Sequence, residues 1–299
     1  MSRLNTAKLI WISFRPKQWI KNLFVLVPLL FSRNLFNYSL AWKVFLGFFF
    51  FCLLAGSVYI LNDIVDIKED KGHPERKNRP LALGKLKIST ALISMLFVLV
   101  LTLSLSFYLH LVFGLLLLGY LILNLVYTKA LKHIVILDVF CIAAGFLLRV
   151  ISGAVLINIE IMEVSEWLLI CTLLLALFLG FAKRKHELMV LGAGAIKHRK
   201  VLAKYDARFL DMVICTLTAS TLISYVLYTM SEQAIYTFEI DKSILTIPFV
   251  LYGIFRYLYL VYYKSKGRGP MWNMLFDLPL LVTVVIWTLT SAGMLYLRG

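Results

Sequence analysis

Long apolar runs alternate along the chain with short polar and basic segments. Nine runs are long enough, or nearly so, to cross a bilayer, because a spanning helix needs about 20 predominantly apolar residues. Their approximate bounds are 19–35, 43–62, 88–108, 110–127, 134–156, 167–182, 211–230, 244–263 and 275–297. This pattern predicts an all-α polytopic membrane bundle of about nine transmembrane helices. There is no low-complexity tract and no Gly/Ser-rich linker, so we expect residues 1–299 to form a single transmembrane domain.

The composition excludes an ordinary soluble domain. The chain is 61% hydrophobic and 16% charged, which is typical of a polytopic membrane protein. Its net charge of +15 would suggest nucleic acid in a soluble protein, but here the cations are explained by their positions against the membrane. We therefore expect no nucleic-acid partner. The four cysteines all lie in apolar runs without a CxxC pair, and the five histidines show no metal-binding spacing.

The cations predict the orientation of the chain. With nine spans and the N-terminus inside, 25 of the 31 Lys and Arg residues lie on one side. The positive-inside rule places that side in the cytoplasm. The basic segment before residue 21 lacks a short apolar core with a cleavage site, so we expect no removable signal peptide. The prediction is a multi-pass protein of the cell (inner) membrane.

Three carboxylates and an amide follow directly on the apolar run 44–61. They form the motif Asn62-Asp63-x-x-Asp66-x-x-x-Asp70. A membrane-embedded carboxylate costs roughly 2.5–3.5 kcal/mol on insertion scales, so three within eight residues require a counter-charge. Their spacing of i, i+3, i+7 predicts one face of a helix. Such carboxylates suit Mg²⁺, which binds oxygen and usually bridges to substrate phosphates. We therefore expect a membrane enzyme that handles a diphosphate on its cytoplasmic face.

A basic loop continues this motif through Arg76, Lys77 and Arg79. Arginine binds phosphate oxygens through paired hydrogen bonds, and Pro74 and Pro80 mark a loop over the site. The competing interpretation is a solvated charged loop after a span. It is less favoured because the carboxylates begin within the apolar run.

A second polar group surrounds the junction of the fourth and fifth runs. Tyr127 and Lys132 precede Asp138 and Arg149, which lie inside the fifth run. Intramembrane acids and arginines usually pair or face a polar cavity. Asp138 lies at the depth of the first motif and is a site candidate. Arg149 is either a site cation or the structural partner of another group.

Two further basic segments are candidates for anion binding. Lys17 and Lys21, at the mouth of the first run, are spaced i, i+4 and are expected on one helix face. Lys183 and Arg184 end the sixth run. The alternatives are an interfacial anchor with neighbouring tryptophans for the first pair and helix-end, positive-inside charge for the second. Asp277 is an isolated acid near the last run, either a site residue or the partner of a structural cation.

These motifs resemble those of the UbiA superfamily of membrane-embedded prenyltransferases. The resemblance covers almost the whole chain, and within the superfamily it is greatest to the decaprenyl-phosphate phosphoribosyltransferase branch. It rests on Asn62-Asp63-x-x-Asp66-x-x-x-Asp70, Arg15-Pro16-Lys17-Gln18-Trp19-x-Lys21-Asn22, Tyr127-x-x-x-Leu131-Lys132 before Asp138-Val139, Gly145-Phe146-x-x-Arg149 and Gly180-Phe181-x-Lys183-Arg184-x-x-Glu187.

The chain departs from the aromatic prenyltransferases at the second motif. Where they carry a second Asp-rich cluster, this chain has only Asp138, behind Tyr127 and Lys132. Fewer anions and more cations suit a donor with an additional phosphate. Phosphoribosyl diphosphate is such a donor, with a diphosphate on C1 and a monophosphate on C5.

The resemblance implies transfer of 5-phosphoribose from phosphoribosyl diphosphate to a polyprenyl (decaprenyl) phosphate, with release of diphosphate, as in cell wall biosynthesis. It implies Mg²⁺ on Asn62, Asp63, Asp66 and Asp70, with Asp66 or Asp138 as the catalytic group that stabilises an oxocarbenium-like centre. Arg76, Lys77, Arg79 and Lys132 are the expected diphosphate ligands. Lys17, Lys21, Lys183 and Arg184 are expected at the 5-phosphate or the lipid phosphate, and Tyr127 and Arg149 complete the substrate-binding set.

Two other functions stay open. One is a prenyltransferase in which the lipid is the diphosphate donor and a small molecule accepts. The other is an ion-coupled transporter, which predicts acids deep in several spans and internal repeats. Most acids lie at one face and no repeat is evident, so the transporter is the less favoured of the two. A homo-oligomer is also left open.

Overall fold

The computed structural model describes residues 3–72, 76–161, 164–191, 200–231, 241–263 and 277–296. Within those ranges every regular element is a helix, and eight helical segments are long and apolar enough to cross a membrane. The helices are α3 (Tyr38–Val65), α5 (Ile88–Leu109), α6 (Leu111–Lys129), α7 (Leu137–Leu156), α8 (Glu166–Leu191), α10 (Ala207–Thr229), α12 (Ile247–Tyr262) and α14 (Leu278–Tyr296). The prediction of an all-α membrane bundle is confirmed.

The first predicted span, 19–35, differs from the others because it is broken. A 3-10 helix, η1 (Pro16–Val25), is followed by the short α2 (Val27–Phe31), and α1 (Arg3–Ser13) precedes both. Leu26 N–H donates to the Leu23 carbonyl, the i→i+3 bond of a 3-10 turn. Pro28 lacks an N–H and lies at the start of α2, where a backbone N–H would have no acceptor within the helix, so no hydrogen bond is lost. Hydropathy alone does not distinguish such a segment from one long helix.

The contacts divide the chain into two compact units. Unit 1 comprises Met1–Lys132 and Gly145–Val164, and unit 2 comprises His133–Ala144 and Ser165–Gly299. The first residues of α7 therefore belong to unit 2 and the rest of that helix to unit 1. The single domain predicted over residues 1–299 stays a prediction.

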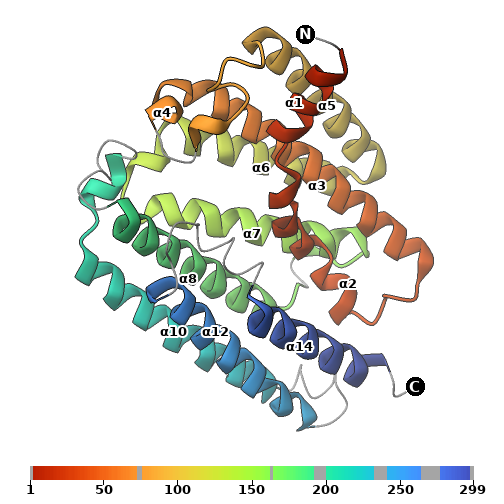
Figure 1. Cartoon of the computed structure of the whole chain (residues 1–299). Helices are drawn as coiled ribbons and strands as arrows, with labels where there is room; N and C mark the ends of the chain where they lie inside the picture. The colour runs from red at the N-terminus through yellow and green to blue at the C-terminus, as the bar shows by residue number, and fades with distance from the viewer. Residues whose placement is uncertain are drawn as a thin grey trace. The chain divides into compact units, whose positions relative to one another are not determined.

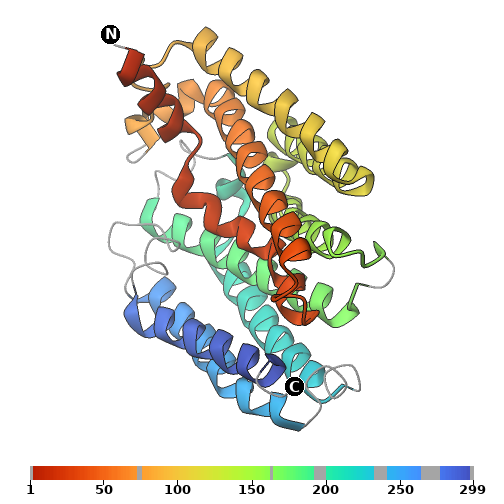
Figure 2. The same ribbon diagram turned by 90° about the vertical axis from the view of Figure 1, so that its right-hand side faces the viewer.

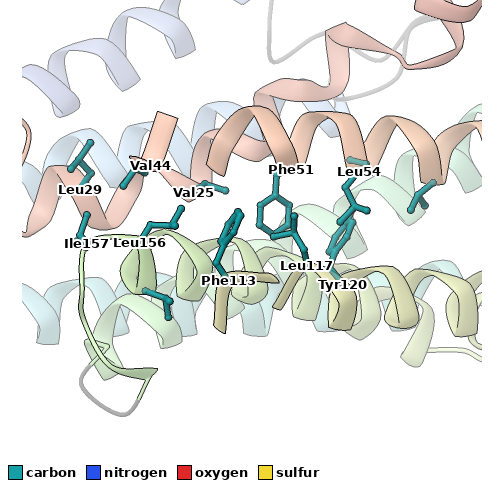
Figure 3. Packing of buried hydrophobic residues seen from close by; sticks show 13 residues of the cluster. Val25, Leu29, Val44, Phe51, Leu54, Phe113, Leu117, Tyr120, Leu156 and Ile157 are labelled. Carbon is teal, nitrogen blue, oxygen red and sulfur yellow. The ribbon is translucent and has the colours of Figure 1, made fainter. Parts of the chain in front are cut away.

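Unit 1 is built around α3. This helix packs against α5, α6 and η1 (Figures 1 and 2), and its composition is apolar all round, as expected of a buried helix. Phe51 on α3 meets the rings of Phe113 and Tyr120 on α6, with centroids 6.2 and 5.5 Å away (Figure 3). The same cluster includes Val25 of η1 and Leu156 at the end of α7.

A close backbone approach fixes η1 against α7. A Cβ on Gly153 would lie 2.0 Å from the Val25 carbonyl oxygen, so only glycine fits there. The polar residues of η1 are thereby carried by a segment that is packed on a membrane helix.

Unit 2 consists mainly of α8, α10, α12 and α14, and α8 packs against both α10 and α12. Asp211 ties three of these helices together, because it accepts from Lys185 Nζ at 2.7 Å and from the Tyr262 hydroxyl at 2.5 Å. Arg256 forms a two-pronged ion pair with Asp277, at 2.9 and 2.8 Å. The structural interpretation of Asp277 is thus confirmed, and the same carboxylate caps α14 through the Leu280 N–H.

Candidate active site

The predicted metal motif spans a break between two helices. Asn62 and Asp63 lie in the last turn of α3, Asp66 caps its end, and Asp70 lies on the short α4 (Ile67–Gly72). The backbone continues almost helically, since Asp66 N–H donates to the Asn62 carbonyl and Asp70 N–H to the Asp66 carbonyl. Asp63 and Asp70 are buried, whereas the Asp66 side chain is 26% exposed.

Two of the three carboxylates converge on one guanidinium. Arg79 Nη1 donates to Asp63 Oδ1 at 3.0 Å and also to Asp70 Oδ2. Arg15 forms a second ion pair with Asp63 Oδ1. The prediction of a shared face therefore holds for Asp63 and Asp70, which meet the same nitrogen.

Asp66 departs from that face because the helix ends at its position, with φ −95° and ψ 15°. Its Oδ1 accepts from Lys132 Nζ at 2.8 Å. Thr128, near the end of α6, lies 2.5 Å from Asn62 Oδ1. Lys132 and Thr128 thus connect the motif to the region around the end of the fourth run. The sequence predicts Lys132 at the same site as the motif.

The two arginines are positioned by apolar anchors. Arg79 lies between η2 (Arg76–Asn78) and the buried Leu81, which packs in a cluster with Phe14 and Ile60. Phe14 lies on Gly56, where a Cβ would come within 2.1 Å of its ring. The next residue, Arg15, takes the left-handed conformation with φ 53° and places its guanidinium over the Tyr59 ring at 5.0 Å. The site cations are therefore held by core packing.

Asp63 and Asp70 have the donor chemistry that a divalent ion requires. A single cationic nitrogen already bridges them, and the buried Asp70 Oδ1 has no hydrogen-bond partner. Burial raises the pKa of the Asp70 carboxyl above its usual range, although the charges of Arg79 and Arg76 oppose the shift. Two carboxylates suit Mg²⁺, which usually takes one or two from a protein and completes its shell with water and phosphate.

The predicted ligand set of Asn62, Asp63, Asp66 and Asp70 stays a prediction. Among the described residues, no three His, Cys, Asp or Glu side chains are arranged to hold a metal ion. Asn62 faces Thr128 and Asp66 faces Lys132. The residues that fit an ion best are therefore Asp63 and Asp70.

The expectation that Lys17 and Lys21 share one helix face is wrong. They lie on η1, and a 3-10 helix has three residues per turn, so residues four apart are rotated by about 120°. Lys21 Nζ instead donates to Gln18 Oε1 at 3.3 Å, one 3-10 turn away. Lys17 is exposed.

Arg149 lies within unit 1 in a buried network of neutral groups. It donates to Asn22 Oδ1 at 2.8 Å, to the Gly145 carbonyl at 2.7 Å and to the Tyr120 hydroxyl at 2.9 Å. The guanidinium also lies over three aromatic rings, that of Tyr120 the nearest at 4.7 Å. No ion pair joins it to a described carboxylate. It ties η1 to α6 and α7, and its charge is not neutralised by a neighbouring acid.

In unit 2, Asp138 is completely buried and both its oxygens are occupied. Oδ2 accepts from Arg184 Nε at 2.7 Å and Oδ1 from the Tyr205 hydroxyl at 2.6 Å. Arg184, 1% exposed, also donates to Glu187 at 3.0 Å. Burial and the bond to Asp138 raise the pKa of Tyr205 well above its usual range. Asp138 and Arg184 thus hold each other, while Lys183 is exposed, 3.8 Å from Glu187.

The other predicted ligands lie near the cluster in unit 1. Arg76 is close enough to favour the ionised form of Asp70, and Lys77 is exposed beside it on η2. Tyr127 is half-buried on α6, one residue before Thr128. Two cationic side chains, Arg76 and Lys77, therefore lie on η2, and Arg76 is close to Asp70.

A family model supplies the decisive comparison. The model of the UbiA prenyltransferase family matches residues 23–278, which is most of the chain. The chain belongs to the UbiA prenyltransferase family.

Two of the curated relatives that the chain resembles have the same name. Decaprenyl-phosphate phosphoribosyltransferase of Mycolicibacterium smegmatis is 33% identical over 223 residues, which cover 73% of this chain and 69% of that one. The protein of the same name from Corynebacterium glutamicum is 32% identical over 224 residues, covering 72% and 65%. The predicted resemblance to this branch is confirmed.

Solved UbiA structures share the fold. A UbiA homologue from Archaeoglobus fulgidus, bound to GPP and Mg²⁺, superposes with a TM-score of 0.69 at 17% identity, covering 96% of this chain and 99% of that one. An apo UbiA homologue from Aeropyrum pernix K1 gives 0.66 at 15% identity, covering 91% and 98%. These structures show the fold, while the family match and the eight apolar helices make the chain a multi-pass membrane transferase of the UbiA type.

Several site residues carry no local sequence signal for their contacts. Tyr205 reaches Asp138 across 67 positions, and Thr128 reaches Asn62 across 66. Arg15 belongs to a recognisable basic segment, yet its pairing with Asp63 depends on the left-handed turn before Pro16. The sequence offers one indirect signal for Thr128 and Arg15: both lie at the ends of apolar runs, where polar side chains are expected at the membrane surface.

Proposed function

We propose that this protein transfers 5-phosphoribose from phosphoribosyl diphosphate to a polyprenyl phosphate, with release of diphosphate. The observation that carries the proposal is a set of three carboxylates paired with three cations, Arg15, Arg79 and Lys132, in a chain with relatives named decaprenyl-phosphate phosphoribosyltransferase. Such a set can exchange partners: carboxylates can turn to a metal ion while the cations turn to phosphate.

Asp63 and Asp70 are the residues that would hold Mg²⁺, with Asn62 and Asp66 as the remaining ligands predicted from the motif. When bound, the ion neutralises charge on the diphosphate leaving group. Arg79, which bridges the two carboxylates, and Arg15 then become available for phosphate oxygens. Arginine suits this role because its planar fork binds two oxygens at once. Arg76 and Lys77, on η2, and Lys132, between α6 and α7, are the further cations proposed to bind the diphosphate.

In the transfer, the bond between ribose C1 and the diphosphate oxygen breaks, and its electron pair leaves with diphosphate. A lipid phosphate oxygen forms the new bond to C1. The ribosyl centre is oxocarbenium-like between these events, as in glycosyl transfer. Asp66 is the group proposed to stabilise that positive charge, since its side chain is partly exposed and Lys132 occupies only Oδ1. The lipid phosphate is already an anion and needs no strong base.

Asp138 has a positioning role in this proposal. It is buried and holds Arg184, and we assign both residues to ordering α8, which carries Lys183. Lys17, Lys21 and Lys183 are proposed for the 5-phosphate or the lipid phosphate. Arg149 and Tyr127 support the site from α7 and α6. The distribution of cations along the chain supports a reaction at the cytoplasmic face of the cell membrane.

The second candidate is prenyl transfer from a lipid diphosphate to a small acceptor. The observation that favours it is the likeness in fold to a homologue solved with GPP and Mg²⁺. The two reactions differ in which substrate carries the diphosphate.

A transfer assay with purified protein in liposomes distinguishes phosphoribosyl transfer from prenyl transfer. With phosphoribosyl diphosphate labelled in its ribose and polyprenyl phosphate in the bilayer, phosphoribosyl transfer moves label into the organic phase. The Asp66→Asn variant is the negative control, because it should keep the fold and transfer little label. If wild-type protein leaves all label in the aqueous phase, but uses a polyprenyl diphosphate to alkylate a small acceptor, prenyl transfer replaces the proposal.

A further inference from the structure

A groove of about 400 Å³ lies on unit 2 between the beginning of α7, α8 and α10. Phe140 comes from α7, Phe181 from α8, and Met212 and Thr216 from α10, with Ile136 at one end. Met212 is 63% exposed and Phe140 45%, so the groove opens to the outside of the unit. Its volume falls in the range of roughly 300–1,000 Å³ that is common for small-ligand sites.

The position of this groove determines what fills it. Both α8 and α10 are long and apolar enough to cross the membrane, and the groove walls are almost entirely apolar. Hydrocarbon, rather than water, therefore occupies such a groove, because the bilayer core offers no water to solvate it.

The end of the groove at Ile136 lies beside a buried polar side chain, Tyr205. The Ile136 N–H donates to the Tyr205 hydroxyl at 2.8 Å, and Ile136 has a φ of 72°, uncommon for a β-branched residue. Tyr205 stacks on Phe209 at 6.3 Å and meets Phe181 edge-on at 6.4 Å. The same hydroxyl that fixes Ile136 also binds the buried Asp138, so the groove ends beside the Asp138–Arg184 pair.

That end also carries exposed positive charge. Arg208 precedes Met212 by four residues and Thr216 by eight, so on α10 these three lie along one stripe. Arg208 and Lys204 are both exposed. Asp206 is the acid between them, and its carboxylate is engaged at the α10 N-terminus by the Arg208 and Phe209 N–H groups. An apolar channel with cations at one end matches a lipid that has one phosphate head and one long tail.

We propose that this groove binds the isoprenoid tail of the polyprenyl phosphate acceptor, with the lipid phosphate beside Arg208. The inference rests on the proposed function and names where the acceptor lies. A groove of this volume, with walls from three segments, takes a single chain, whereas a phospholipid brings two. Its aromatic walls, Phe140, Phe181 and Phe209, offer flat surfaces to the branched methyl groups of an isoprenoid.

Filling the groove tests the assignment. Met212→Trp and Thr216→Trp should each raise the KM for polyprenyl phosphate about tenfold and leave the KM for phosphoribosyl diphosphate unchanged. Ile223→Trp is the matched control, because Ile223 is 58% exposed on the same helix but lies outside the groove. Arg208→Gln should raise the same KM. If wild-type protein transfers phosphoribose and the three groove variants behave like the control, the groove assignment is overturned while the proposed function stands.

A binding measurement decides the groove without turnover. A photo-reactive phenylalanine at position 212 should cross-link to polyprenyl phosphate in phosphatidylglycerol vesicles, and the same residue at position 223 should not. The mass of the adduct identifies the cross-linked lipid. An excess of polyprenyl phosphate that carries no label should compete with the labelled lipid and reduce the labelled adduct. Cross-linking to phosphatidylglycerol alone, without competition, makes the groove an ordinary lipid contact and overturns the inference. Failure of transfer with a retained, competed adduct overturns the proposed reaction and leaves the lipid site.

Discussion

Arg79 is the residue on which the geometry of the carboxylate site depends most. Its Nη1 nitrogen is shared by Asp63 and Asp70, which are 2% and 1% exposed. Two buried carboxylates at one nitrogen repel each other unless a cation lies between them. A guanidinium in that position therefore does in the free protein what a metal ion would do with the donor bound.

Replacing this cation should make the protein depend on Mg²⁺ for stability. Arg79→Gln leaves two buried acids without their common partner, a change that costs about 3 kcal/mol or more. We expect a lower unfolding temperature in chelator and a larger recovery with Mg²⁺ than wild-type protein shows. Thermal unfolding in detergent, with and without EDTA, measures both.

Lys77→Gln provides the control, since Lys77 lies two residues away but is exposed. It should unfold like wild-type protein and respond to Mg²⁺ to the same extent. If Mg²⁺ shifts the unfolding of Arg79→Gln no more than that of Lys77→Gln, Asp63 and Asp70 do not hold the ion.

Asp66 and Asp138 should fail in different ways when each is changed to asparagine. Asp66 is partly exposed, so Asp66→Asn should keep the fold and lower kcat about 100-fold, the scale of losing one electrostatic contact to a transition state. Asp138→Asn leaves the buried Arg184 with less compensating charge, so it should lower stability by about 3 kcal/mol. Its kcat per folded molecule should stay within a fewfold of wild type.

Expression level, unfolding temperature and kcat in liposomes separate these effects. A stable Asp138→Asn variant that has lost turnover would return Asp138 to direct contact with the substrate. Near-normal turnover in Asp66→Asn would remove Asp66 from the reaction.

At this scale the sequence predicts which residues gather but not how they pair. The membrane cost of Asp63 and Asp70 is enough to predict a counter-charge, and Arg79 was among the cations expected nearby. The identity of each partner depends on side-chain packing across distant segments. Tyr205 shows this most clearly, because its bond to Asp138 follows from the fold of the segment after α8 and leaves no pattern in the sequence.

At the scale of elements, hydropathy predicts the positions of the eight long helices and fails at the first run. It also ends the sixth span too early, because α8 continues to Leu191 and carries Lys183 and Arg184 within it rather than at its end. The spans expected at 88–108 and 110–127 match α5 and α6 within two residues. The run 19–35 is interrupted by Lys21, Asn22 and Pro28, and it folds as η1 and α2. Hydropathy reports the free energy of transfer into the membrane and carries no information on the backbone hydrogen-bond pattern. In this segment the pattern depends on Pro16, Pro28 and the contact with Gly153.

The approach of η1 to α7 predicts a contrast between two glycines. Gly153→Ala places a methyl group against the Val25 carbonyl, a backbone atom that cannot turn away, so η1 must shift. We expect a loss of about 1–3 kcal/mol, as for other overpacked sites, and reduced activity because η1 carries Lys17 and Lys21. Unfolding temperature and transfer rate report the two consequences.

Gly119→Ala is the matched control in unit 1, because a Cβ there meets nothing within 4 Å. A helical glycine exchanged for alanine in open space gains roughly 0.5–1 kcal/mol from backbone entropy. Gly119→Ala should therefore unfold at the same or a slightly higher temperature. Equal behaviour of the two variants would contradict a tight contact between η1 and α7.

At the scale of the whole molecule, the asymmetry of charge predicts which side of the membrane carries the site. The α3 helix has 28 residues, about 42 Å at 1.5 Å per residue, which is enough to cross a bilayer. Phe36, just before it, and Lys77, beyond its other end, therefore lie on opposite sides. Of the two sides, the one with Lys77 carries the motif and the greater share of cations, so the positive-inside rule assigns it to the cytoplasm.

Labelling of single introduced cysteines in intact cells checks this orientation. Phe36→Cys, at a site that is 67% exposed, should react with a membrane-impermeant maleimide added outside, and Lys77→Cys should react only after the cells are opened. Wild-type protein, with its four native cysteines, gives the background. The reverse pattern would place Asp63, Asp66 and Asp70 outside, where a cytosolic sugar diphosphate does not reach them. Because only seven positions in the sequence separate Lys77 from Asp70, the accessibility of Lys77 decides the side on which the reaction occurs.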